Sequence, residues 1–158
     1  MINRAMRFLL VDRILELEPG KSIKAEHHIS SDEDFFRDHF PGFPVVPGVL
    51  LTEMMAQAAG KCLDAEGREK GKGKAMLAQI RSAYFRDWVR PDSTALITAE
   101  VRTNQAQYAT AVCAIEVNEA KVCSADLLFS FLPMNEFAPG YRDEVLETFL
   151  ASRKHGKV

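Results

Sequence analysis

The sequence predicts an α+β fold in which a curved antiparallel sheet surrounds one buried helix. Two β-rich segments precede a long apolar helix and four follow it, without the strand-helix-strand alternation of a parallel sheet. The helix, from Val49 to about Ala65, carries apolar residues on every side. Protein must therefore enclose it, and a sheet that wraps around it buries both.

Alternating apolar and polar residues define the strands. Residues 7–18 and 21–30 predict two strands that meet at the turn Pro19-Gly20, and Ser31 is expected to cap a short helix that ends near His39. The helix from Val49 begins at Pro47-Gly48, and the glycine-spaced stretch AEGREKGKGK predicts a loop over residues 65–74. The four later strands are expected in KAMLAQIRSAYF, TALITAEVRT, YATAVCAIEV and KVCSADLLFSF.

The composition fits one domain of ordinary size. With 158 residues, of which 47% are apolar and 27% charged, the chain is long enough to bury a core. We expect residues 1–134 to form the domain and residues 135–158 to extend it. Apolar residues at helical spacing over 145–150 predict an amphipathic helix there, docked on the outside of the sheet or on a partner chain.

Charge and hydropathy narrow the classes of function. The longest apolar runs, Val45 to Leu51 and Ala125 to Leu132, are far shorter than the ~18 residues of a membrane-spanning helix, and no secretion signal is evident. We therefore expect no membrane span and a cytoplasmic location. The net charge of −2 gives no sign of nucleic-acid binding. The three cysteines lack CxxC spacing and are expected to be reduced, buried thiols.

Glu53 is the first candidate for chemistry, because it is the only charged residue between Phe40 and Gly60. A carboxylate in an enclosed helix costs several kcal/mol unless it is paired, hydrogen-bonded or protonated. Gln57, one turn further on, or a backbone group could satisfy it. We favour an acid-base role, since carboxyl groups in apolar surroundings are often functional.

His39 and Gly48 complete a candidate site. His39 stands beside a rigid Pro-Gly turn and forms a reasonable acid-base pair with Glu53, whereas His27, His28 and His155 are interpreted as surface or structural residues. Without a further ligand or an HExxH motif, we expect no metal. The free N–H groups at the helix start, at Gly48, are suited to hold a developing enolate.

The continuous motif DHFPGFPVVPGVLLTEMMAQAAG resembles that of the FabZ-type 3-hydroxyacyl-[acyl carrier protein] dehydratases, HFPGxPxxPGVLxxExMAQ. The similarity extends from Arg7 to Leu132. It implies a hotdog fold, homodimers that often assemble as trimers of dimers, substrates carried on the phosphopantetheine of acyl carrier protein, and no metal or organic cofactor.

The resemblance also implies residue roles. His39 and Glu53 are expected to meet across a dimer interface, one from each chain, and the N–H of Gly48 to face the thioester carbonyl. Pro47 and Gln57 are expected to support the site. A glutamate at position 53, where FabA-type isomerising dehydratases carry aspartate, favours dehydration without migration of the double bond.

Substrate contacts are predicted in two places. Phe43, Val49 and Met54 are candidates to line an acyl channel, although core packing is the stronger interpretation for such side chains. Three basic residues near the expected mouth of the site are candidates to dock the acidic carrier protein: Arg81, Arg86 and Arg90.

The sequence departs from the family pattern at Asp38, at Pro91-Asp92 and in the tail from Asn135. Asp38 is expected either to orient His39 or to cap a turn, and the longer tail suggests a specialised pathway, such as polyene or secondary lipid synthesis. A hotdog thioesterase, an enoyl-CoA hydratase and a non-catalytic acyl-thioester binding module remain alternatives, because one fold hosts many functions.

Overall fold

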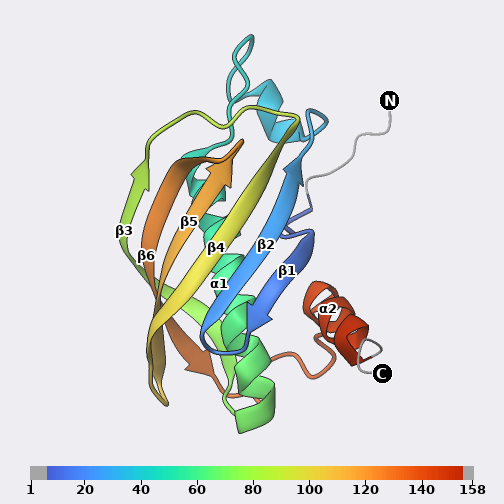
Figure 1. Ribbon diagram of the computed structural model, residues 1–158, viewed down its shortest axis with the longest axis vertical. Coiled ribbons are helices and arrows are strands. Elements are labelled where there is room, and N and C mark those ends of the chain that lie inside the picture. The colour runs from blue at the N-terminus through green and yellow to red at the C-terminus, as the bar shows by residue number, and fades with distance from the viewer. Residues whose placement is uncertain (1–6, 155–158) are drawn as a thin grey trace.

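A computed structural model describes residues 7–154, in which six antiparallel strands curve around helix α1 in the order β1-β2-β4-β5-β6-β3 (Figure 1). The α+β prediction is confirmed. The elements are β1 (Arg13–Glu18), β2 (Ser22–Ile29), the 3₁₀ helix η1 (Asp34–Arg37), α1 (Gly48–Lys70), β3 (Lys74–Phe85), β4 (Ser93–Asn104), β5 (Tyr108–Val117), β6 (Ala120–Leu132) and α2 (Glu144–Lys154).

The inner face of the sheet is lined by small and medium side chains. Buried residues alternate with exposed or partly exposed ones along β2 and β4, as expected for strands with one face toward a core. Alanines on this face let the helix approach closely, and α1 also carries buried alanines. The buried sheet residues include Ala25, Ala95, Ile97, Ala99, Ala109, Ala111, Cys113 and Ile115.

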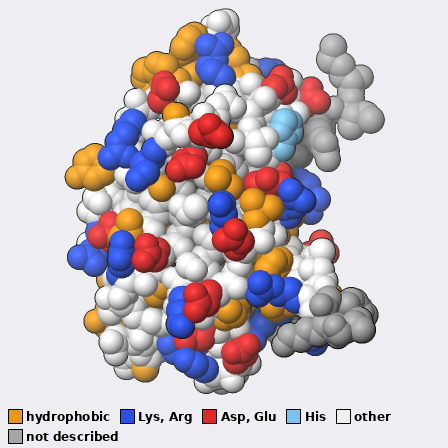
Figure 2. All heavy atoms as spheres, in the orientation of Figure 1, with side chains coloured by type: hydrophobic (Ala, Val, Ile, Leu, Met, Phe, Trp, Pro, Cys, Tyr) orange, Lys and Arg blue, Asp and Glu red, His pale blue; other side chains and the backbone are white. Residues whose placement is uncertain are grey.

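The opposite face of the sheet carries charged side chains and is exposed to solvent. Figure 2 shows lysine, arginine, aspartate and glutamate side chains interspersed over this face, without a large patch of one sign. Hydrophobic side chains gather instead at the upper end of the molecule, where the loop before α1 lies in Figure 1. That end, and not the outer face of the sheet, is therefore the better candidate for a functional site.

Helix α1 is longer than the sequence predicted. It continues through residues 65–70, which the glycine spacing assigned to a loop, and ends at Gly71, whose φ of 69° is left-handed. Packing overrides the weak helix propensity of this stretch, since Ala65 and Gly67 are buried. The Glu66 carboxylate also accepts hydrogen bonds from Lys70 Nζ at 2.7 Å and from Asn104 Nδ2.

The segment before α1 also differs from the prediction. η1 begins only at Asp34, with Glu33 at its N-cap and no side-chain capping bond, so Ser31 is not the cap. The backbone N–H of Ser31 instead donates to Asp92 Oδ1 at 3.3 Å. β1 is shorter than expected as well, because residues 7–12 are extended chain outside the strand.

Helix α2 docks on the sheet edge formed by β1, which confirms the first of the two placements expected for the tail (Figure 1). Leu146 is fully buried, and Arg153 Nη1 donates to the Leu17 carbonyl at 3.3 Å. The division of the domain at residues 134 and 135 stays a prediction.

The three cysteines, Cys62, Cys113 and Cys123, are free and buried. Burial raises the pKa of Cys62 to about 11, of Cys113 to about 12 and of Cys123 to about 11, so all three stay protonated near neutral pH. Among residues 7–154, no helix is both long enough and apolar enough to cross a membrane.

Candidate active site

His39 is held in one orientation by the loop that leads into α1. Its Nδ1 lies 2.9 Å from the Val45 carbonyl oxygen, and its own carbonyl accepts the Val45 N–H at 3.0 Å. Because a carbonyl oxygen only accepts, Nδ1 carries the proton, and Nε2 of the neutral ring has a free lone pair. The imidazole also stacks on Phe40, with ring centroids 4.1 Å apart. The geometry therefore presents Nε2 as a base.

The tip of the same loop is a tight turn. Phe40 and Phe43 exchange two backbone hydrogen bonds of 3.0 and 2.9 Å, and Gly42 between them has a φ of 77°. Only glycine adopts this conformation without strain, which explains the Pro-Gly turn in the motif. The turn leaves the Phe43 ring 45% exposed, with the Arg90 guanidinium 4.3 Å from its centroid.

Gly48 is the first residue of α1 and lies against the end of β3. The N–H groups of Leu50 and Leu51 donate to the Pro47 carbonyl, which leaves those of Gly48 and Val49 at the helix terminus. A Cβ added to Gly48 would come within 3.2 Å of the Phe85 ring. A larger residue at this position would press on the Phe85 ring, so the glycine lets the helix start and the end of β3 lie close together.

Glu53 lies on the second turn of α1 and is only partly buried within one chain. The enclosure that the sequence predicted is therefore incomplete in the described residues. Its Oε1 accepts a 3.1 Å hydrogen bond from Gln57 Nε2. The sequence predicted Gln57, one turn further on, as a group that could satisfy this carboxylate. The carboxylate nevertheless borders a surface groove and keeps one side open.

Gln57 ties the N-terminal segment to α1. Its Nε2 also donates to the Phe8 carbonyl at 3.1 Å, and its Oε1 accepts the Leu10 N–H at 2.9 Å. One amide therefore fixes both the chain before β1 and the carboxylate of Glu53. The sequence predicted that Gln57 would support the site. Its contacts to Phe8 and Leu10 involve backbone groups, which every residue has, so the residue types could not predict them.

The structure gathers some of the predicted residues and separates others. His39, Pro47 and Gly48 lie together at the start of α1, whereas Glu53 follows about 7.5 Å further along the helix axis. Within residues 7–154, no hydrogen bond joins His39 to Glu53. Their pairing across a dimer interface stays a prediction.

The channel candidates divide in the same way. Val49 is 75% exposed and Phe43 is also exposed, so both are available to a ligand. Met54 is 1% exposed and belongs to the main core cluster. This burial favours core packing, the stronger of the two interpretations of Met54, over a place in an acyl channel.

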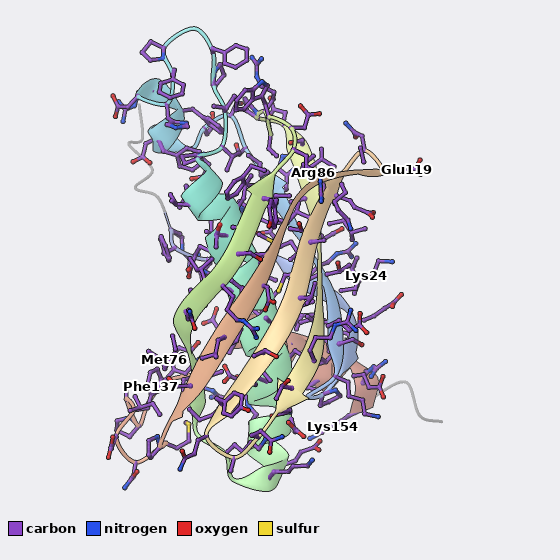
Figure 3. The ribbon with its side chains drawn as sticks, turned by 90° about the vertical axis from the view of Figure 1, so that its left-hand side faces the viewer. Lys24, Met76, Arg86, Glu119, Phe137 and Lys154 are labelled. Carbon is purple, nitrogen blue, oxygen red and sulfur yellow. The ribbon has the colours of Figure 1, made fainter. Side chains whose placement is uncertain are left out.

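The three candidate docking arginines are exposed. Arg81 lies on β3, 4.0 Å from Asp126, and Arg86 follows the end of that strand. Figure 3 shows Arg86 at the upper end of the sheet, on the same side of the view as Glu119. The Arg90 guanidinium lies over the Phe43 ring, which places this arginine beside the site.

The two departures from the family motif have structural roles. Asp38 is the C-cap of η1, where its N–H donates to the Phe35 carbonyl at 3.3 Å, and Val45 rather than Asp38 orients His39. Asp92 has a φ of 60°, so it adopts the left-handed conformation that a Pro-Gly turn would supply.

Two other histidines, His27 and His28, lie on β2. His27 is buried and its Nδ1 contacts Asp12 Oδ1 at 2.9 Å, while His28 is exposed on β2; His155 lies outside the described residues. Burial opposes ionisation of Asp12, but hydrogen bonds from His27 and the His28 N–H hold its pKa below the usual range. Within residues 7–154 no group of three or more potential ligands is placed to hold a metal ion.

Comparison with known proteins identifies the family. The FabA-like domain family matches residues 3–126. A relative from Levilactobacillus brevis, named 3-hydroxyacyl-[acyl-carrier-protein] dehydratase FabZ, is 40% identical over 129 residues, which is 82% of this chain and 86% of the relative. The chain belongs to the FabZ-type dehydratases of the FabA-like family. A second FabZ, from Wolbachia pipientis wMel, is 40% identical over 121 residues, or 76% of this chain and 83% of its own.

Solved structures share the fold of this FabZ-type chain at low sequence identity. The smu.793 protein of Streptococcus mutans, bound to acetyl CoA, has a TM-score of 0.64 at 12% identity and covers 82% of this chain and 95% of its own. The dehydratase heterocomplex ApeI:P of Xenorhabdus doucetiae has a TM-score of 0.58 at 17% identity over 73% of this chain and 92% of that one. The predicted hotdog fold is confirmed.

We expect Gln57→Met to lower the free energy of unfolding by about 1–3 kcal/mol, because the partly buried Leu10 N–H loses its acceptor. Urea unfolding measures the change. Gln107→Met, at an exposed position between β4 and β5, is the matched control and should shift stability by less than about 0.5 kcal/mol. Equal effects of the two substitutions would contradict the role of Gln57 as a tie.

Proposed function

We propose that this chain removes water from 3-hydroxyacyl-[acyl carrier protein] thioesters to give trans-2-enoyl thioesters, in fatty acid or related lipid biosynthesis. The FabZ relatives are named for this activity. The observation that carries the site assignment is the hydrogen bond from His39 Nδ1 to Val45, which leaves Nε2 free to accept a proton.

The reaction needs three groups, and the site offers one for each. His39 Nε2 takes the proton from C2, and the negative charge that develops on the thioester oxygen is held by the N–H of Gly48. Protonated Glu53 gives its proton to the C3 hydroxyl, the C3–O bond breaks, and water leaves as the C2–C3 double bond forms. A proton passed from the imidazolium to the carboxylate restores the site.

We place this chemistry between two subunits. β3 forms one edge of the sheet, and its apolar side chains are exposed, including Met76, Leu77, Ile80, Tyr84 and Phe85. An exposed edge strand of this kind pairs readily with another chain. A homodimer along β3 would cover these side chains and close the space around Glu53, which completes the enclosure that the helix sequence predicts. Assembly into a trimer of dimers stays a prediction.

Acyl carrier protein is the proposed carrier of the substrate. Arg86 is exposed just after β3, and the exposed Arg90 lies over the Phe43 ring of the loop that carries His39, so an acidic carrier would meet positive charge there. A cytoplasmic location stays a prediction. Glu53 in place of aspartate favours release of the trans-2-enoyl product without further isomerisation.

The alternative functions, a thioesterase, an enoyl-CoA hydratase and a non-catalytic binding module, are not favoured by the sequence relatives described above, which are named as dehydratases. A hypothetical thioesterase of Streptococcus pneumoniae, solved with coenzyme A, shares the fold with a TM-score of 0.61, but at 13% identity it carries no argument about the reaction. Mass analysis separates the alternatives, because a dehydratase removes water from the acyl group whereas a thioesterase frees the carrier.

We expect His39→Ala and Glu53→Gln each to lower kcat/KM for dehydration by about 10²-fold or more, since each removes one proton-transfer group. Mass spectrometry of the acyl carrier protein measures the product. His28→Ala, which changes an exposed histidine on β2, is the control and should stay near wild type. Turnover near the wild-type rate in either site variant would refute its assignment.

The composite site predicts complementation between inactive variants. When His39→Ala and Glu53→Gln proteins exchange subunits, half of the dimers carry one intact site, so activity should recover to roughly a quarter of wild type. Light scattering gives the oligomeric state, and differently tagged subunits report exchange. Demonstrated exchange without recovery would place both residues of each site in one chain.

Carrier docking predicts a change in KM. Arg86→Glu combined with Arg90→Glu should raise KM for carrier-linked substrate several-fold and leave kcat nearly unchanged, because neither arginine takes part in bond breaking. Arg81→Glu tests how far the surface extends along β3. A pantetheine-linked substrate is the control, since it lacks the acidic protein. Equal losses on both substrates would mean that the arginines support the fold.

A further inference from the structure

One face of α1 lines a groove that begins at Glu53. Ala56, Gln57, Gly60 and Lys61 follow at helical spacing, and Asp64 lies one turn further on. The groove holds about 390 Å³, and its other walls include Phe8, Leu9, Met76, Leu77 and Phe129. A Cβ added to Gly60 would meet no atom within 4 Å, so the groove is open at that point.

Charged residues close the far end of this groove. Lys61 Nζ lies 2.7 Å from Asp143 Oδ2, with the two side chains 9% and 6% exposed. Lys74 Nζ lies 2.7 Å from Asp64 Oδ2 in a second pair. The Tyr141 ring lies beside them, with its centroid 5.9 Å from Lys74 Nζ. These five residues, called the end wall below, connect α1, β3 and the segment before α2.

The end wall separates two hollows. Asp64, Lys74, Tyr141 and Asp143 line the groove and also a second cavity of about 470 Å³ beyond it. That cavity is bordered by charged residues such as Arg68 and by glycines of the α1–β3 connection. A chain that extends along α1 from Glu53 therefore reaches Tyr141 and the ion pairs before it reaches the space behind them.

The end wall is firmly held. Asp143 caps α2, because its Oδ1 accepts the Leu146 N–H at 3.0 Å while its Oδ2 binds Lys61. Moving this segment would leave the ammonium of Lys61 buried without its partner. Tyr141 and Asp143 both lie outside the residues matched by the FabA-like family, 3–126, so they are features of this chain's extension.

We propose that the C-terminal extension sets the maximum acyl length, with the groove along α1 as the acyl site and the end wall as its stop. This inference rests on the proposed function. The eight residues from Glu53 to Lys61 span about 12 Å, which is roughly the length of ten extended carbon–carbon bonds. Nine to ten bonds counted from a C3 at Glu53 end at about the twelfth or thirteenth carbon, so acyl groups of up to about twelve carbons fit.

The chemistry of the end wall favours a chain that ends in a methyl group. Both lysines of the wall are already paired with carboxylates, so neither is left for a charged group at the end of a substrate. A longer chain would have to displace the Tyr141 ring or separate one of these pairs, whereas a shorter chain leaves the wall intact. The wall therefore acts by exclusion and does not recognise a polar terminus.

The test uses 3-hydroxyacyl carrier-protein substrates from about four to about sixteen carbons, compared by kcat/KM. For the wild-type protein we expect at least a tenfold fall beyond about twelve carbons. Tyr141→Ala, which removes an exposed ring from the wall, should raise kcat/KM for the longest substrates several-fold. Tyr141→Phe keeps the ring and is the matched control. Four-carbon substrates should respond to neither change.

A second variant narrows the groove before the wall. Gly60→Leu should abolish turnover of medium chains and retain that of the four-carbon substrate, while Gly60→Ala controls for the change in helix propensity. Circular dichroism and thermal unfolding verify that each variant folds. Binding of acyl-pantetheines of the same lengths repeats the comparison without requiring catalysis.

The outcomes separate the two proposals. Absence of dehydration at every chain length would refute the proposed function, and the binding series would still report the length limit. Equal use of long and medium chains by the wild-type protein, or a length profile unchanged in folded Tyr141→Ala, would overturn the end wall. A shift of the limit in Tyr141→Ala but not in Tyr141→Phe would establish it.

Discussion

The enclosure of α1 by the curved sheet is the constraint on which the rest of the structure depends. The largely apolar first half of this 23-residue helix is stable only where protein covers it, and the alanine-rich inner face of the sheet lets the two surfaces meet. Once the helix is fixed, its N-terminus is fixed as well. Gly48 then lies against Phe85, and the loop from His39 to Val45 has to close over that end.

The same packing leaves one side of the helix incompletely covered. Glu53 and Gln57 lie on that side, where the N-terminal segment and the edge strand β3 provide only part of a wall. The local amide of Gln57 satisfies one carboxylate oxygen, and the exposed apolar side chains of β3 stand next to the opening. A half-open site beside an unpaired edge explains why a second subunit is part of the proposed function.

The C-terminal extension uses a different interaction. A buried ion pair between Lys61 and Asp143 attaches it to α1, and the Leu146 side chain anchors α2 in the core. Removing one member of such a pair is costly, which makes the attachment specific in position even if its net contribution to stability is small. The extension is thereby placed at the end of the groove that begins at Glu53.

The sequence by itself determined the class of fold, the later strands and the motif from His39 to Gln57, because alternation, helical apolarity and residue spacing are local properties. It misplaced the end of α1, because Asn104, from a distant part of the chain, donates a hydrogen bond to Glu66 near that end. Sequence also left Met54 with two interpretations, channel lining or core packing, and only the packing of the folded helix places its side chain in the core. The free Nε2 of His39 depends on a backbone carbonyl, and the contact between Lys61 and Asp143 joins residues 82 positions apart. Such contacts are decided by the tertiary structure, because they depend on how distant segments pack and not on the residues alone.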